Sequence, residues 1–167
     1  MSHTATLTKL HERFGSERFV ETEFRDNYRI GCPRELVFDV LKFLKEQCHL
    51  DMLVDLTAAD YLEYTGARDR FGVIYALLSV ATGERVYVKV MLNEPDLVLP
   101  SAVPLWQGAN WMEREVYDMY GIRFEGHPDL RRILLPEEFT AFALRKDYPL
   151  RGRGERHNFP TLTRAES

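Results

Sequence analysis

The sequence predicts an α+β fold: a two-layer domain in which helices pack on a mixed or antiparallel sheet, followed by an extended C-terminal arm. An amphipathic helical stripe and a pair of alternating strands in the first hundred residues predict the two layers. Prolines and glycines recur after Gly121, which predicts an arm with little regular structure. We expect an α+β core over residues 1–121, including a helix over 110–120, and the arm over 122–167.

Composition limits the class of protein. The 167 residues include 22 basic and 26 acidic side chains, a net charge of −4, and 45% are hydrophobic. This hydrophobic content suffices for the core of one domain, with or without an arm. A mildly acidic total gives no general attraction to nucleic acid or anionic lipid. The longest nearly apolar run, residues 73–81, is too short to cross a membrane, and the N-terminus lacks the apolar core of a secretory signal.

Two cysteines, Cys32 and Cys48, flank the predicted helix. Sixteen residues of helical rise separate them by roughly 24 Å, which is too far for a disulfide. Two unpaired thiols are typical of a reducing cytoplasm. They are also too few for an iron–sulfur cluster or a structural zinc site.

The first elements follow from local patterns. Residues 7–14 predict a short helix, and residues 18–30 predict an extended stretch because apolar and polar side chains partly alternate. Pro33 stands at the first-turn position that proline favours in a helix. The helix after it carries an apolar stripe at helical spacing, formed by Leu36, Val37, Val40, Leu41, Leu44 and Cys48.

Strands dominate the next forty residues. Residues 52–61 predict a strand, and residues 66–70 predict a turn. Residues 71–80 and 85–92 predict an antiparallel hairpin closed by the turn over 81–84. In its second strand Val86, Val88 and Val90 share one face, and Tyr87, Lys89 and Met91 share the other.

A second helix is expected after Pro95, Pro100 and Pro104. Asn110 is its expected N-cap and Glu113 the reciprocal capping partner. Gly121 stands where a left-handed residue ends a helix. One side of this helix is expected to be apolar and is formed by Trp111, Met112, Val116, Met119 and Tyr120.

The same helix contains a dense polar cluster that could serve acid–base chemistry together with His127. Helical geometry opposes that interpretation, because Glu113 and Glu115 lie about 200° apart around the axis. Arg114 and Asp118 stand four residues apart and are expected to form a surface ion pair. We therefore favour a helix that caps itself and presents its charges to a neighbouring protein.

The arm contains a short basic stretch. Residues 145–156 hold five basic and two acidic side chains, and the apolar residues around them favour a segment ordered by a partner. The stretch lacks the repeats and interleaved aromatic residues of an RNA-binding segment. The chain has no glycine-rich dinucleotide fingerprint or phosphate loop.

Two segments of the chain resemble a known family. Residues 113–115, 118–122 and 124–134 are similar to the signature of the C-subunit family of NADH-quinone oxidoreductase, the 30-kilodalton-type subunit of respiratory complex I. Residues 144–149 are similar to the second hallmark of that family. Residues 141–143 depart from the family's usual Gly-x-Pro, so the turn there is expected to differ locally.

The resemblance implies a subunit that carries no catalytic residue, cofactor or metal of its own. It implies a peripheral position on the cytoplasmic side of the (inner) membrane, within the hydrophilic arm of a proton-translocating NADH:quinone oxidoreductase. FMN, iron–sulfur clusters, NADH and quinone then belong to partner subunits, chiefly the D subunit with its quinone site and the neighbouring iron–sulfur subunits. The matched residues are read as a network for fold and interface, and they are Glu113, Arg114, Glu115, Asp118, Gly121, His127, Pro128, Arg131, Arg132, Arg145, Lys146, Asp147, Tyr148 and Pro149.

Three alternatives stay open. A homologous subunit of a membrane-bound hydrogenase or a ferredoxin-type quinone oxidoreductase has the same signature but a different electron donor. A free-standing enzyme would use Glu115, Asp118 and His127 and show activity or metal uptake as a monomer. A nucleic-acid adaptor would act through the basic stretch of the arm and bind RNA or DNA with a steep salt dependence.

Overall fold

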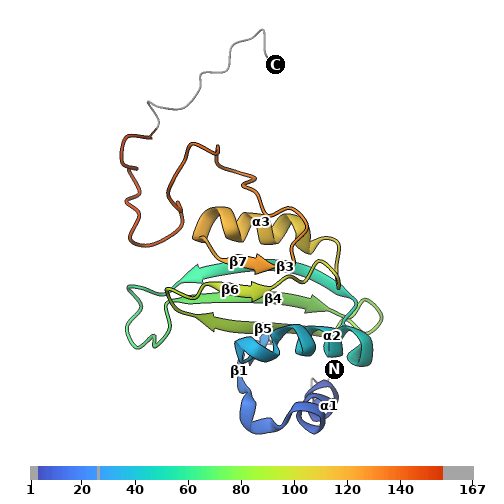
Figure 1. The fold of residues 1–167 in the computed structure, drawn as a ribbon. Coiled ribbons are helices and arrows are strands. Elements are labelled where there is room, and N and C mark those ends of the chain that lie inside the picture. Colours follow the sequence, from blue (N-terminus) through green and yellow to red (C-terminus); the bar gives the residue numbers. More distant parts are fainter. Residues whose placement is uncertain (1–3, 26, 156–167) are drawn as a thin grey trace.

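A five-stranded mixed sheet with helices packed against it forms the body of the molecule (Figure 1). The structure is a computed structural model and describes residues 4–25 and 27–155. No helix of this described part is long and apolar enough to cross a membrane. The helices and strands are α1 (Thr4–Phe14), β1 (Val20–Phe24), β2 (Asn27–Gly31), α2 (Val37–Cys48), β3 (Met52–Asp60), β4 (Phe71–Leu78), β5 (Arg85–Leu92), β6 (Val98–Pro100), α3 (Ala109–Tyr120) and β7 (Arg123–Glu125).

The sheet has the strand order β1-β2-β5-β4-β3. Strands β2 and β5 run parallel, and the other neighbours run antiparallel. The predicted hairpin is confirmed as β4 and β5, which pair from Phe71 with Leu92 to Leu78 with Arg85. A separate two-stranded parallel sheet joins β6 to β7.

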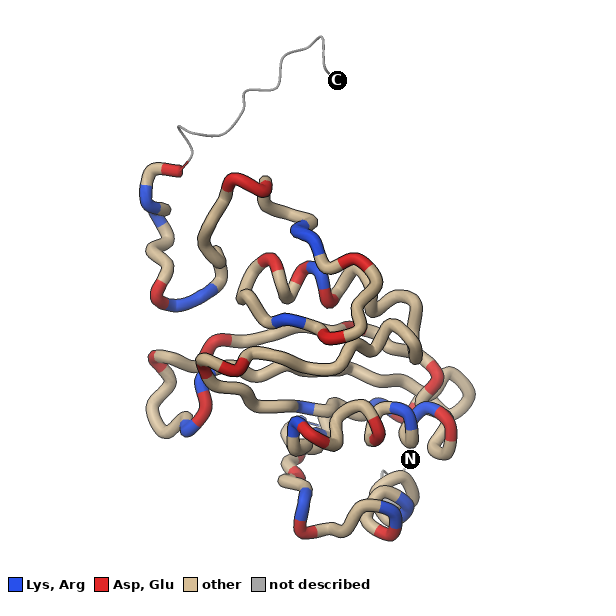
Figure 2. Tube along the Cα trace, in the orientation of Figure 1, with Lys and Arg blue, Asp and Glu red and all other residues tan. Residues whose placement is uncertain are grey.

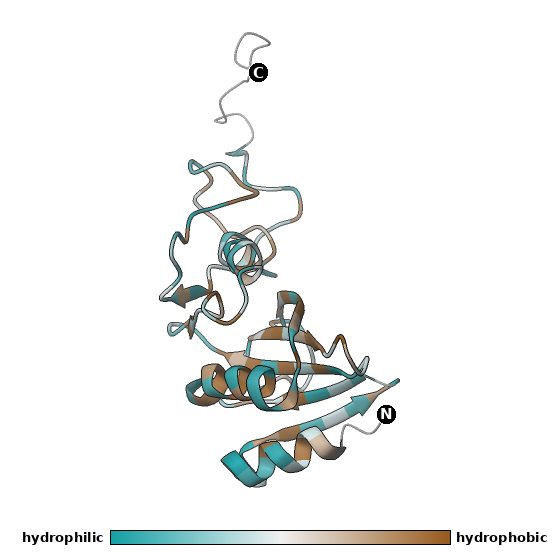
Figure 3. Cartoon of the chain, turned by 90° about the vertical axis from the view of Figure 1, so that its right-hand side faces the viewer, coloured by the Kyte–Doolittle hydropathy of each residue, from teal (hydrophilic) through white to brown (hydrophobic). Residues whose placement is uncertain are grey.

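The hydrophobic core lies between one face of the sheet and the helices α2 and α3. Val73, Tyr75 and Leu77 of β4 point into it, opposite the valines of β5. The stripe predicted for the first long helix is confirmed, because Val37, Val40, Leu41, Leu44 and Cys48 of α2 are buried there. Figure 3 shows the hydrophobic residues concentrated in the central strands. Both cysteines are buried and unpaired, as expected.

Two early elements differ in detail from the prediction. The extended stretch expected over residues 18–30 is two strands, because Arg25 adopts a left-handed φ of 49° and the chain turns back on itself. The helix expected from Pro33 begins with a 3₁₀ turn over Arg34–Leu36 and becomes α-helical only at Val37.

Regular structure continues past the expected core boundary at residue 121. Strand β7 begins at Arg123, shortly after the end of α3, and Ile122 and Phe124 are buried in the same cluster as the sheet. Among the described residues after Glu125 there is no α-helix or strand, and acidic and basic positions are interspersed along this stretch (Figure 2). Residues 156–167 of the expected arm, including Arg156 and Phe159, lie outside the described part. The division into core and arm stays a prediction.

Candidate interface around helix α3 and the C-terminal arm

The ends of α3 show how this helix is set into the molecule. It begins at Ala109 after Gly108, which offers no side chain for capping, so the predicted N-cap at Asn110 is wrong. At the other end Gly121 takes the predicted left-handed conformation, with φ of 78°. A Cβ atom at Gly121 would lie 2.5 Å from the Phe142 ring. Glycine is therefore needed both to end the helix and to let the arm approach it.

Glu113 is fully buried and binds the loop before α3, not the helix terminus. Its Oε2 accepts a hydrogen bond from the Ser101 hydroxyl at 2.7 Å, and its Oε1 accepts one from the Ala102 amide at 2.6 Å. The predicted role of Glu113 as a capping partner is therefore wrong. Burial raises the pKa of this carboxyl to about 7, although both hydrogen bonds favour the charged form.

Two polar side chains lie around Glu113. The Nε2 atom of His127 is 4.0 Å from Glu113 Oε2 and 3.1 Å from the Asn110 carbonyl. Because His127 Nδ1 accepts a hydrogen bond from the Asp129 amide, a neutral ring carries its proton on Nε2. The Tyr75 hydroxyl is completely buried and has no hydrogen-bond partner among the described residues. Burial and then the Glu113 carboxyl raise the pKa of Tyr75.

Asp118 is also fully buried, and it fixes the first part of the arm. Its Oδ1 accepts a hydrogen bond from Arg132 Nη1 at 2.6 Å. Its Oδ2 accepts hydrogen bonds from three successive backbone amides, at 3.1, 2.8 and 2.9 Å, which belong to Ile133, Leu134 and Leu135. Burial opposes the charge on Asp118, but these donors prevail and lower its pKa. The surface ion pair predicted between Arg114 and Asp118 is therefore wrong.

Arg132 connects Asp118 to a later part of the arm. Its Nη2 donates to the Ala141 carbonyl at 3.1 Å, and its guanidinium lies over the rings of Phe139 and Phe142. Phe139 is buried. One guanidinium thus holds residues 118, 132 and 141 together, at the turn where the sequence departs from the family's Gly-x-Pro.

The second hallmark docks onto the ends of three strands of the sheet. Asp60, at the end of β3, accepts a hydrogen bond from the Lys146 amide at 2.9 Å. Arg70, just before β4, forms ion pairs with Asp60 at 3.0 Å and with Asp147 at 2.8 Å. Hydrogen bonds from Arg70, Lys146 and Leu62 offset burial and lower the pKa of Asp60.

Arg145 completes this attachment. Its Nη1 lies 2.7 Å from Glu94, which follows β5, and its Nε donates to the Tyr120 carbonyl at the end of α3 at 2.6 Å. Its guanidinium lies over Phe71 and Phe142, at 5.1 and 4.7 Å from the ring centres. Sequence reasoning missed Asp60, Arg70 and Glu94, because they are distant in sequence from the hallmark and belong to no local pattern.

The remaining signature residues lie closer to the surface. Arg114 donates to the carbonyls of Arg131 and Arg132, both at 3.1 Å, and lies over the Trp111 ring. Trp111 is 62% exposed, so its predicted place on the apolar side is wrong. Leu134 of the arm is 61% exposed. The other exposed members are Glu115, Pro128, Arg131, Lys146, Asp147 and Pro149, whereas Tyr148 is partly buried against Phe139.

This arrangement supports contact better than chemistry. The acid–base set of the enzyme alternative is not assembled, because Glu115 is exposed while Asp118 is buried beneath the arm. Within the described residues, no group of three or more His, Cys, Asp or Glu side chains is placed to hold a metal ion. An exposed Trp beside an Arg is typical of the residues that dominate protein–protein binding energies. We call Trp111, Arg114, Glu115 and Leu134 the α3 surface.

Comparison with known proteins identifies the relatives of this chain. Residues 30–154 match the family model described as the respiratory-chain NADH dehydrogenase 30 Kd subunit. The C subunit of NADH-quinone oxidoreductase from Trichlorobacter lovleyi is 44% identical over 89% of this chain and 90% of its own length. The C/D subunit of the Azotobacter vinelandii NADH-quinone oxidoreductase is 44% identical over 87% of this chain, and the match spans 26% of that longer protein.

Two solved structures share the fold. A trypsin-resistant fragment of Nqo5 is 36% identical with a TM-score of 0.68, and the match covers 74% of this chain and 98% of the fragment. A protein of an archaeal membrane-bound sulfane sulfur reductase has a TM-score of 0.75 at 21% identity, over 96% of this chain and 93% of that one. The second likeness concerns the fold alone.

Proposed function

Since the chain belongs to the family of the respiratory-chain NADH dehydrogenase 30 Kd subunit, we propose that it is the C subunit of an NADH-quinone oxidoreductase. The observation that carries this proposal is the 40–44% identity to named C subunits over 87–89% of the chain. The same relatives favour an NADH-linked complex over the hydrogenase or ferredoxin-type alternatives. The activity belongs to the whole complex, and the role of this chain is to hold other subunits together.

The D subunit is the proposed principal partner. In Azotobacter vinelandii the C-like part is joined to a D part in one polypeptide, which supports close association of the two parts. The proposed contact is the α3 surface. The hydrogen bonds and ion pairs that Asp118 and Asp60 form with the arm hold this surface in place. We assign the electron-carrying cofactors and the quinone site to the partners, and we propose that this chain lies on the cytoplasmic side of the (inner) membrane as a peripheral part of the membrane complex. This chain contributes no catalytic residue of its own in this proposal.

Purification of the tagged chain from its native membrane tests the proposal. We expect the D subunit and iron–sulfur subunits to co-purify, together with NADH-dependent quinone reduction. Arg114→Ala removes two hydrogen bonds to the arm and is expected to lower the amount of assembled complex several-fold, with little change in turnover per complex. Arg68→Ala is the matched control, because Arg68 is exposed on the β3–β4 loop. Normal assembly of Arg114→Ala with abolished quinone reduction would contradict the structural role.

A further inference from the structure

The five-stranded sheet has a second face, opposite the hydrophobic core. The pairing register places Gly72, Ile74 and Ala76 of β4 on this face, next to Met91, Lys89 and Tyr87 of β5 respectively. Helices α2 and α3 bury their apolar residues in the cluster on the other side. We call this second face, which no helix of the described part covers, the open face.

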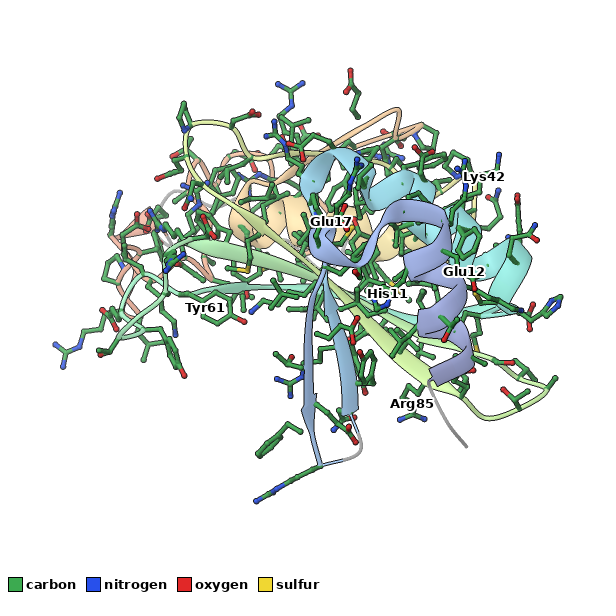
Figure 4. All side chains as sticks on the ribbon, turned by 90° about the horizontal axis from the view of Figure 1, so that it is seen from below. His11, Glu12, Glu17, Lys42, Tyr61 and Arg85 are labelled. Atoms are coloured by element: carbon green, nitrogen blue, oxygen red, sulfur yellow. The ribbon has the colours of Figure 1, made fainter. Side chains whose placement is uncertain are left out.

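The β1–β2 hairpin turns the open face into a groove. Figure 4 shows this hairpin projecting from the sheet on the side away from α2 and α3. A hollow of about 500 Å³ lies between the hairpin and β5, with Val20 and Thr22 on the wall and Met91 on the floor. A second hollow of about 390 Å³ is lined by Ile74 and Tyr87. Arg29 and Lys89 line both hollows, so the two lie next to each other.

Apolar side chains are exposed along this groove. Val20 is 69% exposed and Phe24 is 56% exposed, and the register places both on the open face. Ile74, Tyr87 and Met91 are only partly buried. Contiguous exposed apolar surface with a polar rim is typical of protein-binding sites.

The charges of the groove are unbalanced. Neither Arg29 nor Lys89 has a carboxylate partner among the described residues, since Lys89 Nζ donates to the Tyr61 hydroxyl at 2.9 Å and Arg29 lies over the Phe24 ring. No acidic residue of the described part lines either hollow, and the register places only Asp55 on this face, on the far strand β3. A chain with net charge −4 therefore has a basic groove.

Gly72 leaves room for the Lys89 side chain in the groove. A Cβ atom at Gly72 would lie 2.8 Å from Lys89 Cε and 3.0 Å from the Tyr61 ring. Because glycine leaves this space open, the lysine stem lies across β4 and its ammonium group meets the Tyr61 hydroxyl. Arg29 and Lys89, which have no carboxylate partner among the described residues, lie beside apolar side chains of the groove. Such a surface complements a segment that carries carboxylates among apolar residues.

We propose that the open face is a second docking surface, which binds an acidic segment of a partner protein that also carries apolar side chains. This inference rests on the proposed function, because the partner is another subunit of the same complex. The carboxylates of the segment pair with Arg29 and Lys89, and its apolar side chains cover Ile74, Tyr87 and Met91. The open face is distinct from the α3 surface, which lies beyond the core on the other side of the sheet.

Photo-crosslinking in the purified complex tests this proposal. The photoreactive residue p-benzoylphenylalanine replaces Tyr87 in the tagged chain, and the complex is purified from native membranes and irradiated. We expect an adduct with one partner peptide that contains more Asp and Glu than Lys and Arg, as identified by mass spectrometry. The same residue at Lys42, on the outer side of α2 away from the hairpin (Figure 4), is expected to give no adduct with that peptide.

Charge reversal provides the second part of the test. Arg29→Glu combined with Lys89→Glu is expected to lower the adduct yield at least tenfold, whereas Lys42→Glu leaves it unchanged. An assembled complex that gives no adduct, an adduct with lipid or a second copy of this chain, a neutral or basic partner peptide, or a yield insensitive to charge reversal would each overturn the proposal. The subunits of the complex are identified before irradiation. If the chain enters no NADH-quinone complex, the proposed function is contradicted at that step. This inference, which rests on the proposed function, is then contradicted as well.

Discussion

The two halves of α3 each bury a carboxylate completely, but they surround it differently. Glu113 in the N-terminal half has one hydroxyl and one amide as donors, whereas Asp118 in the C-terminal half has three amides and a guanidinium. Burial raises the pKa of Glu113 to about 7, but at Asp118 the donors outweigh burial and lower the pKa. The four donors at Asp118 thus outweigh the cost of burying its charge, whereas the two donors at Glu113 bind the loop before the helix without outweighing that cost.

Asp118→Ala is expected to have the largest effect on stability of the substitutions in α3. The substitution leaves the Arg132 guanidinium and three amides without their acceptor, and we expect the free energy of unfolding to fall by about 3–5 kcal/mol. Urea denaturation of the purified chain measures this loss. The control is Glu115→Ala on the exposed side of the same helix, with an expected change within about 0.5 kcal/mol. Equal losses for the two variants would show that Asp118 does not fix the arm.

The pH dependence of stability separates the two carboxylates. A group with a raised folded pKa binds more protons folded than unfolded, so Glu113 makes stability fall as pH rises from about 4.5 to 7. The effect is on the order of 3 kcal/mol, because one pKa unit corresponds to about 1.4 kcal/mol. Asp118 and Asp60, with lowered pKa values, lose their contributions only as pH falls through the acidic range below about 4.

Glu113→Gln isolates this contribution. The amide keeps the shape of the side chain and stays neutral, so the decline in stability between pH 5 and pH 8 is expected to shrink by most of that amount. Denaturant titrations at the two pH values, on the native chain and the variant, give the comparison. An unchanged decline would mean that the Glu113 carboxyl titrates in its ordinary range.

Arg145→Gln tests whether charged hydrogen bonds hold the second hallmark in place, as the hydrogen bonds to Asp118 hold the first part of the arm. The variant loses the charged hydrogen bonds to Glu94 and the Tyr120 carbonyl, so we expect local opening of residues 142–148 to become easier by about 2 kcal/mol. Native-state hydrogen exchange measures this opening. Arg131→Gln is the control, because its ion pair with Asp129 is exposed and worth less than about 1 kcal/mol.

Trp111→Ala is expected to have the smallest effect on stability, within about 0.5 kcal/mol, because the ring is largely exposed. Its effect on assembly is expected to be large, since exposed Trp residues often dominate binding. Quantifying the assembled complex against Leu62→Ala, an exposed leucine on the β3–β4 loop, checks this expectation. A stable Trp111→Ala chain that assembles normally would remove the α3 surface from the interface.

Patterns close in sequence predicted the fold well. The alternating residues of β4 and β5, the apolar stripe of α2 and the left-handed Gly121 all depend on neighbours within a few positions, and the structure confirms them. The β1–β2 turn was missed because its alternating pattern runs on through the reversal at Arg25.

The environment of the site could be predicted only in part. The family resemblance selected the residues around α3, but charged helix residues are ordinarily exposed, so Glu113 and Asp118 were expected at the surface. Their partners come from a loop before the helix and from the arm after it, and no helical spacing reveals them. Asp60 and Lys146 are 86 positions apart, which places their contact beyond any local pattern.

The contact between Asp60 and Lys146 has a consequence for the order of folding. The socket that receives residues 145–147 is made from Asp60, Arg70 and Glu94, at the ends of three different strands, and it exists only after those strands have paired. During synthesis these residues of the arm also leave the ribosome after all of the strands. A nascent polypeptide with an incomplete sheet therefore cannot dock residues 145–147 of the arm. A docked arm thus indicates that the sheet is complete and that the subunit is ready for assembly.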